Sequence, residues 1–126
     1  MSTALQVSPK AMAVYRATAR RRWEEEQQAL ARRRERAWQV AHRAVALLKE
    51  QFGATQVAAF GSLVHGFWFS GTSDIDLATW GLKFDDYFVA VAKLQDISPE
   101  FKIDLVAVEH CRPAPREAIV REGKPL

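Results

Sequence analysis

The stretch from Ala11 to Gln51 contains neither glycine nor proline, and this absence most narrows the folds open to the chain. Alanine, arginine, glutamate, glutamine and leucine dominate it, and these residues form helices readily. Ser8-Pro9 suits a helix start, and Gly53 suits a helix stop. The pattern predicts a helix over residues 36–52, where one apolar stripe recurs at helical spacing, with residues 10–35 also helical. The stripe consists of Trp38, Ala41, Val45, Leu48 and Phe52.

Composition places the chain among globular proteins. It has 126 residues, of which 48% are hydrophobic and 26% charged, which suits one domain. We therefore expect one folded domain at residues 36–126, preceded by a helical extension at residues 1–35. No apolar stretch is long enough to span a bilayer, and the first residues lack a signal-peptide pattern. We expect a cytoplasmic protein that has no membrane partner.

The single cysteine excludes one class of site. Cys111 cannot form an internal disulfide, and it cannot build a metal site from cysteines. Any metal site must therefore use oxygen or histidine ligands.

Short apolar segments after Gly53 predict an α/β fold. Residues 55–60, 74–79 and 101–108 have the length and composition of strands. Residues 85–95 and 116–121 are expected to be helices, the first with aspartates in its first turn and the second opened by prolines. The fold class that we expect is α/β, with a small mixed sheet flanked by helices and preceded by a long N-terminal helix.

Three aspartates in two of the expected strands indicate a metal site. Asp74 and Asp76 are two residues apart, so their side chains share one face of the strand. Two like charges this close disfavour ionisation unless a cation lies between them. Mg²⁺ takes oxygen ligands and binds carboxylates together with substrate phosphates. Asp104 has the same apolar neighbours and completes the cluster if its strand lies beside that of Asp76.

A glycine and a serine lie just upstream of these acids. Gly61-Ser62 directly follows the first expected strand and starts a short turn or helix. Glycine permits close approach of the backbone to a phosphate. Backbone N–H groups at a helix start, with a serine hydroxyl, form an anion site. A phosphate site beside a metal cluster is typical of proteins that bind nucleoside triphosphates.

The segment FGSLVHGFWFSGTSDIDL, residues 60–77, resembles the signature of the minimal nucleotidyltransferases, which include antitoxins, in the DNA polymerase β-like superfamily. The segment Ile103–Val106 is similar to the place where that family carries its third metal-binding acid. The likeness extends over residues 38–123 and implies a polymerase-β-like palm. The loop between Ser62 and Asp74 is one residue longer than usual and is rich in aromatic residues.

The resemblance implies an activity and a set of roles. The family transfers a nucleoside monophosphate from a nucleoside triphosphate to a hydroxyl group and releases pyrophosphate. Asp74, Asp76 and Asp104 are implied as the catalytic and metal-binding acids, with Mg²⁺ or Mn²⁺ as the metal. Gly61, Ser62 and Ser73 are implied to bind the nucleotide, for which ATP is the expected choice. Relatives of this size act as antitoxins that attach AMP to a HEPN-type ribonuclease toxin, so a toxin of this type is the expected partner.

Two other functions remain open from the sequence. The chain could neutralise a partner by binding alone, without catalysis. It could instead bind nucleic acid through its basic N-terminal half, which holds eleven lysines and arginines against five acidic residues. The arginines of residues 20–22 and 32–34 are interrupted by glutamates, which favours a solvated or partner-binding helix over a nucleic-acid arm. His65 is expected on the surface, and the sequence does not indicate the oligomeric state.

Overall fold

The computed structural model describes residues 7–126. It begins with the helix α1, Pro9–Phe52, which confirms the predicted helix and both of its ends. The hydroxyl of Ser8 accepts a hydrogen bond of 3.1 Å from the Ala11 N–H, which caps the first turn. Gly53 ends the helix with φ +70°, and the Ala54 N–H donates to the Leu48 carbonyl at 3.1 Å.

The described chain divides into two compact units after Arg32. The first contains the N-terminal part of α1, and almost all of its side chains are exposed. The second contains the end of α1 and all of the strands. The sequence predicts a boundary after residue 35, between a helical extension and a functional domain. The division after Arg32 reflects compactness only, so the predicted boundary stays a prediction.

A four-stranded mixed sheet forms the centre of the second unit, which confirms the predicted fold class. Its strands are β1 (Gln56–Phe60), β2 (Ile75–Trp80), β3 (Ile103–Ala107) and β4 (Lys124–Pro125). They lie in the order β3-β2-β1-β4. Strand β2 runs antiparallel to β1 and parallel to β3, so a crossover must join β2 to β3. The helix α2, Tyr87–Gln95, makes that crossover.

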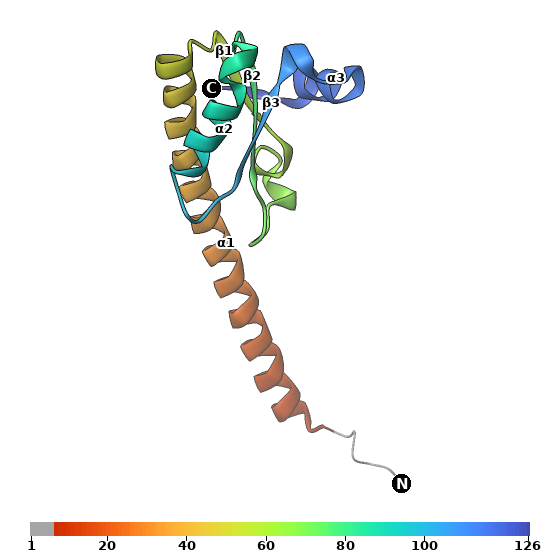
Figure 1. Ribbon diagram of the computed structural model, residues 1–126. Helices are drawn as coiled ribbons and strands as arrows, with labels where there is room; N and C mark the ends of the chain where they lie inside the picture. The colour runs from red at the N-terminus through yellow and green to blue at the C-terminus, as the bar shows by residue number, and fades with distance from the viewer. Residues whose placement is uncertain (1–6) are drawn as a thin grey trace. The chain divides into compact units, whose positions relative to one another are not determined.

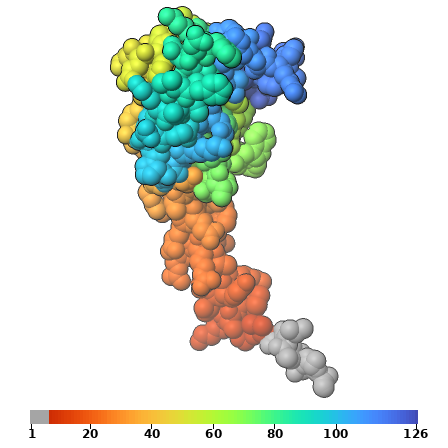
Figure 2. All heavy atoms as spheres, in the orientation of Figure 1, coloured from red at the N-terminus to blue at the C-terminus, as the bar shows by residue number. Residues whose placement is uncertain are grey.

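The two faces of the sheet are covered differently. Figure 1 shows α2 and the end of α1 on one side and α3, Pro113–Glu122, on the other. Leu77 and Ile103 are fully or almost fully buried, as are the α1 residues from Ala37 to Leu48 that point inward. Figure 2 shows α2 covering much of the near side of this unit.

Helix α3 covers only one end of its face. Its Ile119 packs in a small cluster with Ala78 of β2, and Trp80 packs against that cluster. Side chains on one strand face repeat every two residues, so Asp76 lies on this same face. It is only half-buried, one step beyond the cluster. Helix α3 therefore leaves free the end of this sheet face where Asp76 lies, and a functional site can form there.

Some details differ from the sequence predictions. Asp74 precedes β2 rather than beginning it. Asp85 and Asp86 form a separate 3-10 turn, Phe84–Asp86, before α2 instead of its first turn. Helix α3 starts at Pro113, because proline fits the first turn of a helix. Strand β4 is not predicted, since two residues are too short to show a period.

Side chains of α2 protect the edge strand β3. The Tyr87 hydroxyl donates to the Leu105 carbonyl at 2.7 Å, and the Gln95 amide donates to the Ile103 carbonyl at 2.7 Å. These bonds occupy groups that an exposed edge would offer to another strand. Within residues 7–126, no helix has both the length and the apolar composition needed to cross a membrane.

Candidate active site

Asp76 and Asp104 lie side by side on two parallel strands. Asp76 of β2 is the direct partner of Asp104 of β3 in the register of the sheet. Neighbouring strands are about 4.8 Å apart, and paired residues point to the same face. The structure therefore brings together two acids that are 28 positions apart in the sequence. The sequence analysis expected Asp104 to join the other acids only if its strand lay beside that of Asp76, and β3 does lie beside β2.

Asp74 completes the group from the residue before β2. It stands two positions before Asp76 and is half-buried. The pKa of Asp76 is raised from 3.8 to about 6, first by burial and then by the negative charges of Asp104 and Asp74. All three acids thus interact electrostatically, and the negative charge gathered there favours a cation.

The chemistry of these ligands fits a hard divalent cation. Carboxylate oxygens are the ligands that Mg²⁺ prefers, and one or two of them suffice when substrate phosphates supply the rest. Among residues 7–126, however, no three histidine, cysteine or acidic side chains are gathered closely enough to hold a metal ion together. Asp104 is 45% exposed, and its Oδ1 lies 3.6 Å from the Lys102 ammonium group. Metal binding by all three acids therefore stays a prediction.

Gly61 places the start of a turn directly against Asp76. Phe60 ends β1 opposite Asp76, and Gly61 follows with φ +74°. A Cβ atom at residue 61 would overlap with the Asp76 carboxylate. Glycine is required here for two reasons, since both the positive φ and the lack of space exclude a side chain. The turn and the acids therefore form one site.

The two predicted serine ligands lie at opposite ends of the following loop. Ser62 is in the 3-10 helix η2, Gly61–Leu63, next to the acids, and is half-buried. Ser73 stands immediately before Asp74, and its hydroxyl accepts a hydrogen bond of 2.8 Å from the Ser70 N–H. Ser73 thus closes a turn of the loop. Nucleotide binding by either serine is untested and stays a prediction.

Arg34 of α1 holds the first half of this loop. Its guanidinium group donates to the Leu63 carbonyl at 2.7 and 3.0 Å and to the Val64 carbonyl at 3.3 Å. It also lies against Gly66, where an added Cβ would come within 2.8 Å of the guanidinium carbon. These contacts fix the residues that directly follow Gly61-Ser62.

Arg33 holds the second half of the loop. It donates to the carbonyls of Ser70 and Ser73 at 3.4 and 3.3 Å. Its guanidinium carbon also lies 4.4 Å from the centre of the Phe101 ring, just before β3. The loop is therefore fixed at both ends by adjacent arginines of one helix.

These two arginines are the residues that sequence reasoning missed. The expectation of a solvated or partner-binding arginine run is wrong for Arg33 and Arg34, which are half-buried against the loop. They precede the buried Ala37 by four and three residues, so they continue the inward stripe of α1. That spacing is the signal that could have separated them from the exposed Arg32.

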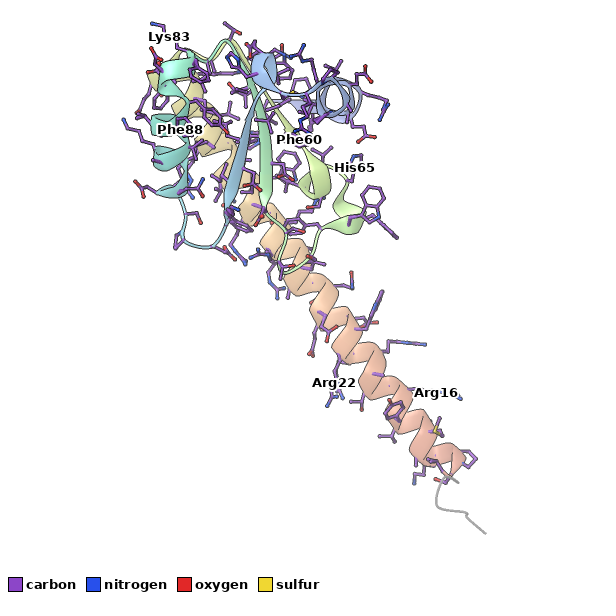
Figure 3. All side chains as sticks on the ribbon, turned by 45° about the vertical axis from the view of Figure 1, so that its right-hand side comes forward. Arg16, Arg22, Phe60, His65, Lys83 and Phe88 are labelled. Atoms are coloured by element: carbon purple, nitrogen blue, oxygen red, sulfur yellow. The ribbon has the colours of Figure 1, made fainter. Side chains whose placement is uncertain are left out.

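Aromatic side chains extend from the middle of the loop. Phe67 and Trp68 are 93% and 67% exposed, whereas Phe69 is buried. The ring of His65 lies 5.3 Å from that of Trp68, and its Nε2 is 3.5 Å from Glu122 of α3. Figure 3 shows His65 in the loop, on the side of the sheet away from Phe88 of α2. The expected surface histidine is thus half-buried, between the loop and α3.

Comparison with known families identifies the region around these residues. Residues 43–126 match the family described as Polymerase beta, Nucleotidyltransferase. This match contains the Gly-Ser turn and the three acids. No curated protein matches the chain.

Two solved toxin-antitoxin structures share the fold. A toxin-antitoxin with AMP-PNP is 24% identical and has a TM-score of 0.55, over 64% of this chain and 67% of the other. A mutant of the toxin-antitoxin MntA-HpeT is 19% identical and has the same TM-score, over 67% of this chain and 69% of the other. A protein described as a minimal nucleotidyltransferase is 27% identical, with a TM-score of 0.48, over 79% of this chain and 94% of the other.

Proposed function

Since this chain belongs to the polymerase beta nucleotidyltransferase family, we propose that it transfers AMP from ATP to a hydroxyl group of a partner protein. The observation that carries the proposal is the pairing of Asp76 with Asp104, directly beside the Gly61 turn. A nucleotidyl transfer needs carboxylates for a metal and a separate group for the phosphates. In this chain the carboxylates and the Gly61 turn lie next to each other.

Each part of the site has a defined task in this reaction. Asp74, Asp76 and Asp104 hold Mg²⁺, for which Mn²⁺ is the alternative. The metal, when bound, offsets the charge of the phosphates and orients them for in-line displacement. Gly61 and Ser62 hold the triphosphate through backbone N–H groups and the serine hydroxyl. Ser73 supports the nucleotide from the far end of the loop.

Asp104 also accepts the proton of the attacking hydroxyl. The hydroxyl oxygen forms a bond to the α-phosphorus, and the bond from that phosphorus to the bridging oxygen of the β-phosphate breaks. Pyrophosphate leaves, and the AMP group remains on the acceptor. The half-exposed position of Asp104 at the open end of the sheet suits this contact with an external acceptor.

We propose a HEPN-type toxin as the acceptor, with this chain acting as its antitoxin. Two structures with the same fold are toxin-antitoxin proteins, one of them with AMP-PNP. The exposed Phe67 and Trp68 next to the site offer an apolar contact for a protein acceptor.

The test is transfer of label from radioactive ATP. The full chain is incubated with Mg²⁺, α-labelled ATP and the protein encoded by the neighbouring gene. We expect label on that protein, and none when Asp76→Asn replaces the native chain. Asp85→Asn, an exposed acid away from the site, is the matched control and should retain transfer.

Two outcomes would replace this proposal with another. If Asp76→Asn neutralises the toxin as well as the native chain does, the chain acts by binding alone. If no protein is labelled and the chain instead binds RNA with a steep salt dependence that requires residues 1–35, it is a nucleic-acid-binding module.

A further inference from the structure

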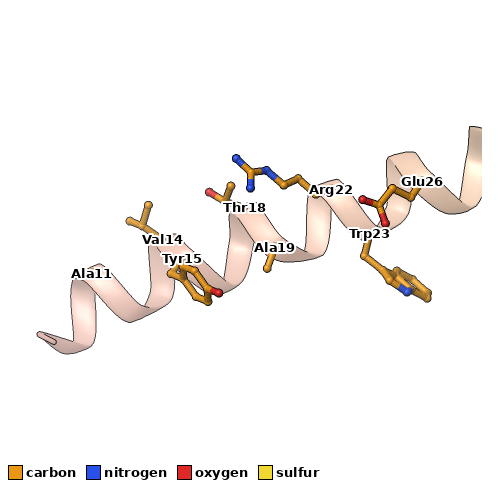
Figure 4. Close-up of a pocket in the computed structure, with 8 residues that line it drawn as sticks. All are labelled: Ala11, Val14, Tyr15, Thr18, Ala19, Arg22, Trp23 and Glu26. Carbon is orange, nitrogen blue, oxygen red and sulfur yellow. The ribbon is translucent and has the colours of Figure 1, made fainter. Parts of the chain in front are cut away.

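The arginines of α1 have different surroundings. Arg22 borders an open surface hollow of about 610 Å³ together with Tyr15 and Trp23, and all three side chains are exposed (Figure 4). The side chain of Arg33, in contrast, is only 17% exposed. Burial of a charged group is costly unless the group is paired, so the partners of Arg33 indicate what this residue does.

Arg33 contacts two segments that are far apart in the sequence. Its Nη2 and Nε donate to the carbonyls of Ser73 and Ser70, at 3.3 and 3.4 Å. Its guanidinium carbon lies 4.4 Å from the centre of the buried Phe101 ring, and its Nη1 lies 3.4 Å from the Glu100 carboxylate. The first segment leads into β2 and the second into β3. One guanidinium group therefore joins the starts of the two strands that carry the acids.

This bridge bears on Asp74 more than on the other acids, because Asp74 directly precedes β2 and is not part of the strand. The next residue, Ile75, donates its backbone N–H to the Lys102 carbonyl at 2.9 Å. On the other side of Asp74, the Ser73 carbonyl accepts from Arg33. Asp74 is therefore held by a backbone bond at the residue after it and by Arg33 at the residue before it.

We propose that Arg33 is a positioning residue for Asp74, which fixes Asp74 relative to Asp104 and thereby sets how tightly the acids bind a divalent cation. Asp76 and Asp104 do not need this support, because the register of β2 and β3 already pairs them. The inference rests on the proposed function, in which the three acids hold the metal. Groups that orient a metal ligand typically contribute roughly 10–100-fold to metal affinity.

The sign of the effect separates positioning from charge. A guanidinium group near a metal site repels the cation, so charge alone predicts tighter metal binding when Arg33 is removed. Glu100 offsets part of that charge, although it also pairs with Arg36 at 2.7 Å. Positioning predicts the opposite result, which is weaker metal binding.

Titration of the full chain with Mn²⁺ alone, followed by electron paramagnetic resonance, tests the role without nucleotide or acceptor. Arg33→Ala should lower the Mn²⁺ affinity by about tenfold. Arg33→Lys should also lower it, because an ammonium group keeps the charge but cannot bind both carbonyls and stack on Phe101 at once. Arg34→Ala is the matched control. It removes bonds to other carbonyls of the same loop, next to the Gly61 turn, and should leave the Mn²⁺ affinity unchanged.

A cycle of single and double substitutions tests whether Arg33 acts through Asp74. Asp74→Asn removes the ligand that Arg33 positions, so Arg33→Ala should weaken Mn²⁺ binding no further in the Asp74→Asn background. Additive losses would overturn the proposal. Hydrogen exchange at the Ile75 amide gives a second readout that needs no metal. It should be faster in Arg33→Ala and unchanged in Arg34→Ala.

Three other results would also overturn the proposal. These are native or tighter Mn²⁺ binding by Arg33→Ala with native circular dichroism, native binding by Arg33→Lys, and an equal loss in Arg34→Ala. If Arg33→Ala does not fold, the milder Arg33→Lys supplies the result. A native chain that binds Mn²⁺ but transfers no AMP would refute the proposed function, while the variants would still test the role of Arg33. A native chain that binds no Mn²⁺ would refute both.

Discussion

Gly61 lies so close to Asp76 that a side chain at residue 61 would overlap with the Asp76 carboxylate. This contact joins the two parts of the candidate active site, the phosphate turn after β1 and the acids of β2 and β3. It results from the antiparallel pairing of β1 with β2, which sets Phe60 opposite Asp76. A substitution at residue 61 should therefore affect the acids as well as the turn.

Gly61→Ala should lower the free energy of unfolding and abolish nucleotidyl transfer. The loss of stability should be at least about 1 kcal/mol, because alanine is strained at a positive φ and its Cβ would overlap with the Asp76 carboxylate. Urea unfolding and the labelled-ATP assay measure the two effects. Gly71→Ala is the control, since Gly71 has open space around it, and no loss is expected there. Equal behaviour of the two variants would contradict the close approach.

Arg34→Ala should destabilise the chain by about 1–2 kcal/mol and raise the KM for ATP. The substitution leaves the carbonyls of Leu63 and Val64 without their charged donor and releases the turn that follows Ser62. Denaturant unfolding and steady-state kinetics give the two values. The exposed Arg32→Ala is the matched control and should change neither. An unchanged KM in Arg34→Ala would show that the loop does not need this anchor.

Asp76→Asn should make the metal-free protein more stable while it removes activity. The raised pKa of Asp76 means that its charged form is disfavoured in the folded state. The full shift of about two pKa units corresponds to roughly 3 kcal/mol, and partial exposure reduces the expected gain to about 1–2 kcal/mol. Urea unfolding at pH 7.5 in EDTA measures it. A less stable Asp76→Asn would contradict the charge repulsion.

The gain from Asp76→Asn should depend on pH. Asp76 has a pKa of about 6 when folded and 3.8 in the reference state, so the folded chain binds more protons between these values. The contribution of Asp76 to the free energy of unfolding therefore falls as the pH rises through this window. The stability difference between Asp76→Asn and the native chain should be small near pH 4 and largest above pH 6. A difference that is constant with pH would exclude this origin.

Mg²⁺ should raise the melting temperature of the native chain at pH 7.5. A ligand at a hundredfold excess over its Kd stabilises the folded state by about 2.7 kcal/mol. Thermal unfolding with and without Mg²⁺ and a non-hydrolysable ATP analogue measures the shift. Asp76→Asn and Asp104→Asn should each lose it, whereas Asp85→Asn should keep it. Retention of the shift in both site variants would place the metal elsewhere.

The local elements could be predicted from the sequence because their signals lie within a few neighbouring residues. The missing glycines and prolines predicted α1, and Ser8-Pro9 and Gly53 gave its ends. The spacing of Asp74 and Asp76 predicted one shared strand face, because side chains of a strand alternate, although Asp74 lies just before β2. The Gly61-Ser62 turn could also be predicted, because it directly follows the residues of its strand in the sequence.

The tertiary structure decided which distant segments meet. Only the parallel pairing of β2 with β3 makes Asp104 the neighbour of Asp76, and strand order is not encoded in the period of either strand. The spacing from Ala37 could separate Arg33 and Arg34 from the exposed Arg32, but only the packing of α1 shows that the two arginines bind the carbonyls of the loop. Sequence patterns report which face of an element is buried, whereas the partner on that face depends on how the whole chain packs.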